Sequence, residues 1–268
     1  LYDAPGFALL LANFRETFLE AQPNRDLSDY VAERIRARVN DPQVAEQLIP
    51  RDHGFGMRRM PMETGYFEAY NRDNVRLVSL LDTPIERITK TGLQTSEESF
   101  DFDVLVYATG FDVMTGAFDK IDIRGADGQR LKEKWQGSPT TYLGVMVNGF
   151  PNMLMVAGPQ SVSGSTNYPR AIEVCVDWIG ALLEHVRTAG LSRLEADVDA
   201  ENTWTQEVID MQEAMPFSKV KSWFTGFNAN VQAADAAPRY VAYWGGAPRY
   251  TNILKRVASE GFRDINMD

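Results

Sequence analysis

The stretch VLVYATGFDV, Val104 to Val113, is an apolar run that ends at a glycine followed by an aromatic residue and an acid. A nearly continuous apolar run bounded by turn residues is typical of a strand covered on both faces, as in a parallel sheet. In open α/β sheets, ligands bind outside the carboxyl ends of the strands. Gly110 stands at that end, where the missing side chain would let a ligand or a second backbone approach. By spacing alone, a glycine that only turns the chain is an equally good interpretation.

The pattern around this run mixes helices and short strands. The first 50 residues have helical periodicity, and Asp41-Pro42 predicts an N-cap and first position for a helix over 42–49. Further helices are predicted at 64–71, 166–185, 199–215 and from 250 onward. Strands are predicted at 75–80, 84–89, 92–95, 100–108, 143–147, 152–158 and 239–246. This mixture predicts an α/β or α+β protein.

Composition excludes several classes of function. A net charge of −10 over 268 residues argues against nonspecific binding to nucleic acid or anionic lipid. The single cysteine, Cys175, excludes an internal disulfide framework and favours a reducing compartment, so we expect a cytoplasmic protein. Two histidines and one cysteine cannot form an ordinary zinc site, and no EF-hand spacing is present, so we expect no metal. No apolar run is long enough for a membrane span.

Two adjacent arginines, Arg58 and Arg59, follow the loop GFG in an otherwise acidic chain. Adjacent side chains of an extended segment point in opposite directions, so the pair could face two different groups. The guanidinium fork suits a phosphate, and its permanent charge suits a developing oxyanion. A solvated surface pair is the simpler interpretation. The chain contains no G-x-G-x-x-G after a strand, no Walker loop and no G-x-S-x-G elbow.

Two further stretches are candidates for binding. In AGPQSVSGSTNYPRAIE, Ala157 to Glu173, a predicted strand leads through a polar loop into a long helix. Backbone N–H groups at the start of such a helix can hold an electronegative ligand atom, although an ordinary strand-to-helix connection reads the same. In KSWFTGFNANV, Trp223 lies in a loop that could close over a cofactor, or could simply be packed.

These stretches, in this order, resemble the C-terminal half of Baeyer–Villiger monooxygenases. The likeness covers most of the chain and is carried by DPQVAEQLIP, GFGMRRMPMETGYFEAYNRDNVRLV, TPIERIT, DFDVLVYATGFDVMTGAFDKIDIRG, LKEKWQGSPTTYLGVMVNGFPNMLMVAGPQS, STN and SWFTG. ATGFD alone is shared by many flavoproteins with two dinucleotides, whereas the ordered set with LKEKW, TYLG and GFPN is much more specific.

The resemblance implies part of an α/β flavoprotein with Rossmann-like FAD and NADPH domains and a helical insertion. It implies three regions: a helical insertion at 1–55, the C-terminal part of the NADPH-binding domain at 56–102, and the C-terminal part of the FAD-binding domain at 103–268, with a mobile loop near 218–237. The dinucleotide fingerprints of the family lie upstream of the matched region. We therefore expect a missing N-terminal half as partner, and we expect the chain alone neither to bind FAD tightly nor to turn over.

The resemblance also assigns roles to residues. Arg59 matches the catalytic arginine that stabilises a C4a-peroxyflavin, and Arg58 the basic residue that holds the NADPH 2′-phosphate. Thr109, Gly110, Phe111 and Asp112 would border the FAD, and the backbone at Asn167 and Tyr168 would meet the flavin ring. The remaining assignments are Ser163, Gly164 and Ser165 for the substrate pocket and Trp223 for the loop over the nicotinamide cofactor.

The implied reaction uses O2 and NADPH to insert one oxygen atom next to a ketone carbonyl, which gives an ester or lactone. Two alternatives stay open at this point. One is an FAD-dependent monooxygenase that oxygenates nitrogen or sulfur. The other is an inactive fragment that lacks the N-terminal nucleotide-binding half.

Overall fold

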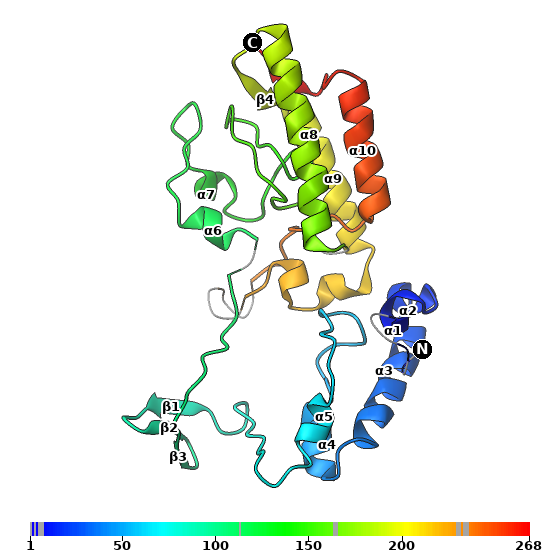
Figure 1. The fold of residues 1–268 in the computed structure, drawn as a ribbon, viewed down its shortest axis with the longest axis vertical. Coiled ribbons are helices and arrows are strands. Elements are labelled where there is room, and N and C mark those ends of the chain that lie inside the picture. Colours follow the sequence, from blue (N-terminus) through cyan, green and yellow to red (C-terminus); the bar gives the residue numbers. More distant parts are fainter. Residues whose placement is uncertain are drawn as a thin grey trace. The chain divides into compact units, whose positions relative to one another are not determined.

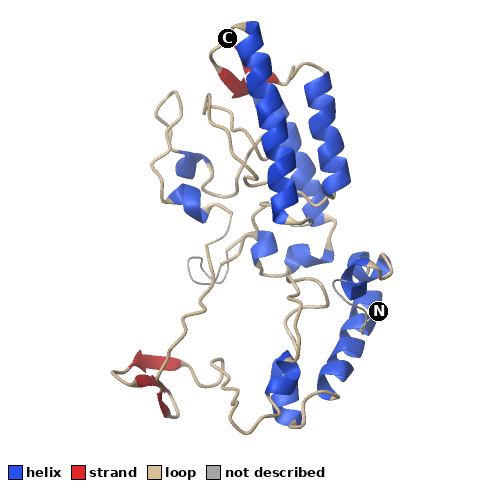
Figure 2. Cartoon of the chain, in the orientation of Figure 1, coloured by secondary structure: helices blue, strands red, loops and turns tan. Residues whose placement is uncertain are grey.

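The computed structural model describes residues 2, 4, 8–112, 114–162, 166–228, 232 and 236–268. The chain divides into two compact units, unit 1 (Leu1–Phe111) and unit 2 (Asp112–Asp268). Figure 1 follows the chain through its helices and strands, and Figure 2 separates helix, strand and loop. None of the described helices is both long enough and apolar enough to cross a membrane.

The described residues of unit 1 form five helices followed by a small sheet. The helices are α1 (Ala8–Leu11), α2 (Glu16–Leu19), α3 (Ala21–Arg36), α4 (Pro42–Leu48) and α5 (Tyr66–Ala69). The cap predicted for α4 is confirmed, because the Asp41 carboxylate accepts a hydrogen bond from the backbone N–H of Gln43 at 2.8 Å. The antiparallel sheet has the order β1 (Ile85–Ile88), β2 (Gly92–Thr95), β3 (Ser99–Asp101). Two of these strands confirm the predictions at 84–89 and 92–95.

The strand predicted at 75–80 is wrong, and of the strand predicted at 100–108 only the first two residues form one, as the end of β3. Residues 104–112 carry no strand assignment, and Val104 and Val106 are 76% and 78% exposed. An apolar run becomes a strand only where a neighbouring strand receives its backbone hydrogen bonds, and among the described residues none pairs with this one. The run therefore lacks the neighbouring strands and the burial that its apolar composition led us to expect.

Unit 2 is built on three long helices, which Figure 1 shows close together: α8 (Tyr168–Ala189), α9 (Val198–Glu213) and α10 (Ala247–Ser259). Their facing sides form one apolar core, which includes Cys175, Leu182, Trp204, Tyr250 and Leu254. Shorter elements are α6 (Gly116–Asp119), α7 (Leu131–Lys134) and the 3-10 turns η1 (Pro216–Lys219) and η2 (Trp223–Thr225). The antiparallel pair β4 (Leu194–Ala196) and β5 (Ile265–Met267) was not predicted.

Three predicted strands of unit 2, at 143–147, 152–158 and 239–246, are also wrong. Many of their apolar residues are buried, with Val145 and Val241 fully inaccessible, although Val156 is 49% exposed, and the backbone runs in turns and loops. Leu143 and Gly144 have φ of 57° and 69°, so the chain reverses where a strand was expected. Tyr142 N donates back to Met146 O at 2.8 Å across this turn. Burial, which the apolar composition correctly indicated, is satisfied here without a sheet.

Candidate functional site

The loop that precedes the two arginines is fastened to α3 by a buried asparagine. Asn24 donates through Nδ2 to Thr17 O at 2.7 Å and to Phe55 O at 2.9 Å, and Phe55 N donates to Ser28 Oγ at 2.9 Å. A Cβ added at Gly54 would lie 1.9 Å from Asn24 Oδ1. Because Asn24 is buried and held by two hydrogen bonds, it cannot move aside. The glycine before Phe55 is therefore needed for close approach to this side chain.

The two arginines have different surroundings. Arg58 donates to Asp52 Oδ2 at 2.6 Å, and the other carboxylate oxygen of Asp52 lies 2.7 Å from His53 Nδ1. The hydrogen bond with His53, supported by the charge of Arg58, lowers the pKa of Asp52. Arg59 is exposed, and no carboxylate among the described residues forms an ion pair with it. The pair thus separates into one arginine held by an acid and one that presents its charge to solvent.

The segment that follows the arginines is held by Arg38, two residues beyond the end of α3. Its guanidinium donates to Glu63 at 2.8 Å and to Glu68 at 2.7 Å and lies 4.9 Å from the centre of the Phe67 ring. The hydrogen bonds to Glu68 and Glu63 raise the pKa of Arg38, and the hydrogen bond from Arg38 lowers the pKa of Glu68 to about 2. Asn24 therefore anchors the residues just before the two arginines, and Arg38 anchors the residues that follow them.

The ATGFD stretch is open around its glycine. Gly110 has φ of 81°, and no atom lies within 4 Å of the position that a Cβ would take. Phe111 is 89% exposed. The carboxylate of Asp112 packs against Gly116, where an added Cβ would lie 2.3 Å from Asp112 Cγ. The positive φ alone explains why position 110 is a glycine. No described atom fills the space beside it.

A single glutamine organises the GPQS stretch. Gln160 is fully buried; its Oε1 accepts from Thr141 N, Thr141 Oγ1 and Thr205 Oγ1 at 3.0–3.2 Å, and its Nε2 donates to Pro139 O at 2.6 Å. Its backbone N–H donates to Val241 O at 2.8 Å. Gln160 therefore joins four stretches of unit 2 that are remote in sequence. The sequence analysis missed this role, because a glutamine in a polar loop gives no signal of burial.

The long helix α8 begins at the expected place. Asn167 is its N-cap, but the Asn167 side chain makes no capping hydrogen bond, and Tyr168 is 47% exposed. The first backbone N–H groups of a helix have no partner within the helix. The predicted substrate residues Ser163, Gly164 and Ser165 lie outside the described residues.

Trp223 opens the short turn η2 beside an aromatic cluster. Its ring centroid lies 4.6 Å from that of Phe224, which in turn lies 4.9 Å from Trp244. Thr225 fixes the turn, because its carbonyl accepts from Arg239 N at 2.8 Å and its hydroxyl donates to Val220 O at 2.9 Å. Part of the loop predicted near 218–237 lies outside the described residues.

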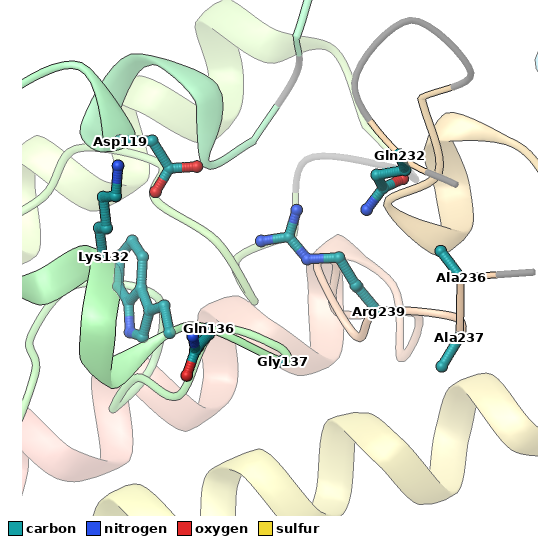
Figure 3. Close-up of a pocket in the computed structure, with 9 residues that line it drawn as sticks. Asp119, Lys132, Gln136, Gly137, Gln232, Ala236, Ala237 and Arg239 are labelled. Carbon is teal, nitrogen blue, oxygen red and sulfur yellow. The ribbon is translucent and has the colours of Figure 1, made fainter. Parts of the chain in front are cut away.

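Unit 2 has a cavity of about 440 Å3 that the sequence did not indicate. Figure 3 shows Arg239 entering it across from Asp119 on α6 and Lys132 on α7, with Ala236 and Ala237 on one wall. Arg239 donates to Thr115 Oγ1 at 2.8 Å. No residue predicted for the site lines this cavity. No cluster of acidic, histidine or cysteine side chains among the described residues could hold a metal ion.

Comparison with known proteins gives relatives along the whole chain. No family model matches. The 2-oxo-Δ3-4,5,5-trimethylcyclopentenylacetyl-CoA monooxygenase of Pseudomonas putida is 38% identical over 100% of this chain and 49% of its own length. The acetone monooxygenase (methyl acetate-forming) of Gordonia sp. (strain TY-5) is 37% identical over 98% and 49%. The cyclopentanone 1,2-monooxygenase of Comamonas sp. (strain NCIMB 9872) is 35% identical over 100% and 48%.

Solved structures give the same match. A crystal structure of OTEMO in complex with FAD and NADP superposes with a TM-score of 0.92 at 38% identity, over 100% of this chain and 49% of that one. An oxidised steroid monooxygenase bound to NADP has a TM-score of 0.86 at 36% identity, over 95% and 46%. The chain thus spans about half the length of the relatives it matches. It has the fold of part of a two-domain flavoprotein, and over its whole length it is similar to the C-terminal half of Baeyer–Villiger monooxygenases.

Proposed function

We propose that this chain forms the C-terminal half of an NADPH- and FAD-dependent monooxygenase that inserts one oxygen atom from O2 next to a ketone carbonyl. The product is an ester or lactone, and the second oxygen atom leaves as water. The observation that carries the proposal is the match along the whole chain to several ketone monooxygenases at 35–38% identity.

Two local features of the described residues support a bound cofactor. The space beside Gly110 is open, and the first N–H groups of α8 are not capped by the Asn167 side chain. We infer that Thr109, Gly110, Phe111 and Asp112 border the FAD, and that the α8 terminus at Asn167 and Tyr168 receives an electronegative ligand atom. When bound, FAD supplies the redox chemistry that activates O2 with electrons from NADPH.

Arg59 carries the proposed catalytic charge. A guanidinium stays protonated even when it is covered, so it stabilises an anionic oxygen on the substrate side. No described carboxylate neutralises it, which supports this role. Arg58 is assigned to the 2′-phosphate of NADPH, where the phosphate would compete with Asp52 for its N–H groups.

The roles of the mobile loop, the ketone pocket and the domain boundaries concern the assembled enzyme. We propose that Trp223, in a loop near 218–237 that moves, covers the nicotinamide cofactor and that Ser163, Gly164 and Ser165 line the ketone pocket. We place the boundaries of the helical, NADPH and FAD regions at 55/56 and 102/103. The single cysteine, buried in α8, supports a cytoplasmic protein.

The test is to purify the chain alone and together with an N-terminal half, and to record the visible absorption spectrum and intact mass of each sample. We expect a colourless 30.1 kDa chain by itself, and a yellow complex that consumes NADPH when a ketone is added. One relative is a phenazine N-monooxygenase, 36% identical, so an aromatic amine serves as the comparison substrate. Oxygenation of the amine without any reaction of ketones would contradict the proposal.

A further inference from the structure

Helix α8 has an apolar surface that the core of unit 2 does not use. One face is buried against α9 and α10 and consists of Ala171, Cys175, Trp178, Leu182 and Val186. A second set of residues faces outward, and we call it the α8 stripe: Ile172, Val176, Gly180 and Leu183. Ile172, Val176 and Leu183 are 38–48% exposed, and Gly180 is exposed too.

The stripe is continuous and lies beside the core face. At about 100° per residue, its centre lies roughly 110° around the helix from the centre of the buried face. Glu173, Asp177 and Glu184, together with Arg170, occupy the remaining polar sector. Apolar residues thus cover more than half of the circumference, and a helix with so wide an apolar surface is normally packed on more than one side. In Figure 1 no described element lies in front of α8.

Gly180 gives an independent indication that a second backbone packs here. Glycine in the middle of a helix is unfavourable relative to alanine. Among the described residues, no atom outside the helix backbone and the two chain neighbours lies within 4 Å of the position that its Cβ would take, so no described contact requires a glycine. Its place between Val176 and Leu183 suits the close approach of another element across the stripe.

We infer that the α8 stripe is a docking surface for the N-terminal half of the enzyme. The chain spans about half of its relatives' length, so a second half of similar size is available to cover it. A second copy of this chain fits less well, because each copy carries a net charge of −10 and an acidic sector beside the stripe. The inference rests on the family relationship and on the half-enzyme part of the proposed function, not on the proposed chemistry.

The experiment is co-purification. The chain is expressed with a tagged N-terminal half of the Pseudomonas putida relative, and the amount captured is compared between variants. Val176→Lys is expected to lower capture at least about tenfold, since a charge would be buried without a partner. Gly180→Leu is expected to lower capture while it raises the thermal stability of the chain alone, because leucine is the better helix former. Asp177→Lys, one residue from Val176 in the polar sector, is the matched control.

Capture of the wild type and of the control, but not of the stripe variants, supports the docking surface. Three outcomes overturn it: failure to capture the wild type, equal capture of all variants, or a dimer of the chain alone that Val176→Lys dissociates. The measurement needs no turnover. Capture with the expected pattern but without ketone oxidation would therefore count against the proposed function only.

Discussion

Glu201 is the residue whose loss should destabilise unit 2 most clearly. It is only 3% exposed; its Oε1 lies 2.8 Å from Lys134 Nζ, and its Oε2 accepts from Asn148 N at 2.6 Å. Glu201→Ala removes a charge-assisted hydrogen bond to a backbone N–H and leaves the ammonium of Lys134 without its carboxylate. Breaking a buried pair from one side costs about 3–5 kcal/mol.

We place the cost near the lower limit, about 3 kcal/mol, because Lys134 is 18% exposed and keeps its hydrogen bond to Asn148 O at 2.7 Å. For a unit of this size, that corresponds to a fall of about 6–12 °C in Tm. Glu201→Gln keeps the shape and one acceptor, and should lose about half as much free energy. The control is Glu184→Ala, which removes an exposed pair with Arg187 and should leave Tm unchanged.

The assay is thermal and denaturant unfolding of the chain, followed by circular dichroism. A double-mutant cycle with Lys134→Met isolates the coupling between the two charges. The reasoning is refuted if Glu201→Ala costs under about 1 kcal/mol, or if the effects of the two single substitutions simply add.

Four further changes test the site and its supports. Arg59→Ala in the assembled enzyme should leave NADPH able to reduce the flavin but abolish ester formation, and unchanged ester yield would refute the catalytic role. Arg58→Ala should raise the KM for NADPH with little change for NADH, measured by steady-state kinetics. Gly110→Ala should cost about 1 kcal/mol from its φ of 81°, and a fall in FAD affinity in the assembled enzyme would show that the cofactor approaches there. The folded pKa of Glu68 is depressed to about 2 by Arg38, so its contribution to stability is present above the unfolded pKa and is lost as pH falls from about 4.5 towards 2; Glu68→Gln should flatten the Tm profile in that window.

Local signals in the sequence predicted the elements whose determinants lie within a few residues. Asp41 and Pro42 fixed the start of α4, and apolar periodicity located α8, α9 and α10. The turn residues around β1 and β2 located the two strands of a hairpin, whose pairing is short-range. The ordered motifs also indicated the same group of monooxygenases that the comparisons found. All of these depend on contacts between residues close in sequence, or on the identity of the residues themselves.

The tertiary structure decided which apolar runs are buried, which backbone conformation they adopt, and which partners the buried polar residues bind. Val104–Thr109 and Leu143–Val147 have the same strand-like composition, yet the first is exposed and the second is buried in a turn. Composition reports a preference for burial, whereas a strand needs hydrogen-bonding neighbours that are remote in sequence. For the same reason, the roles of Asn24, Gln160 and Glu201 were not predictable, because each depends on partners brought together only by folding.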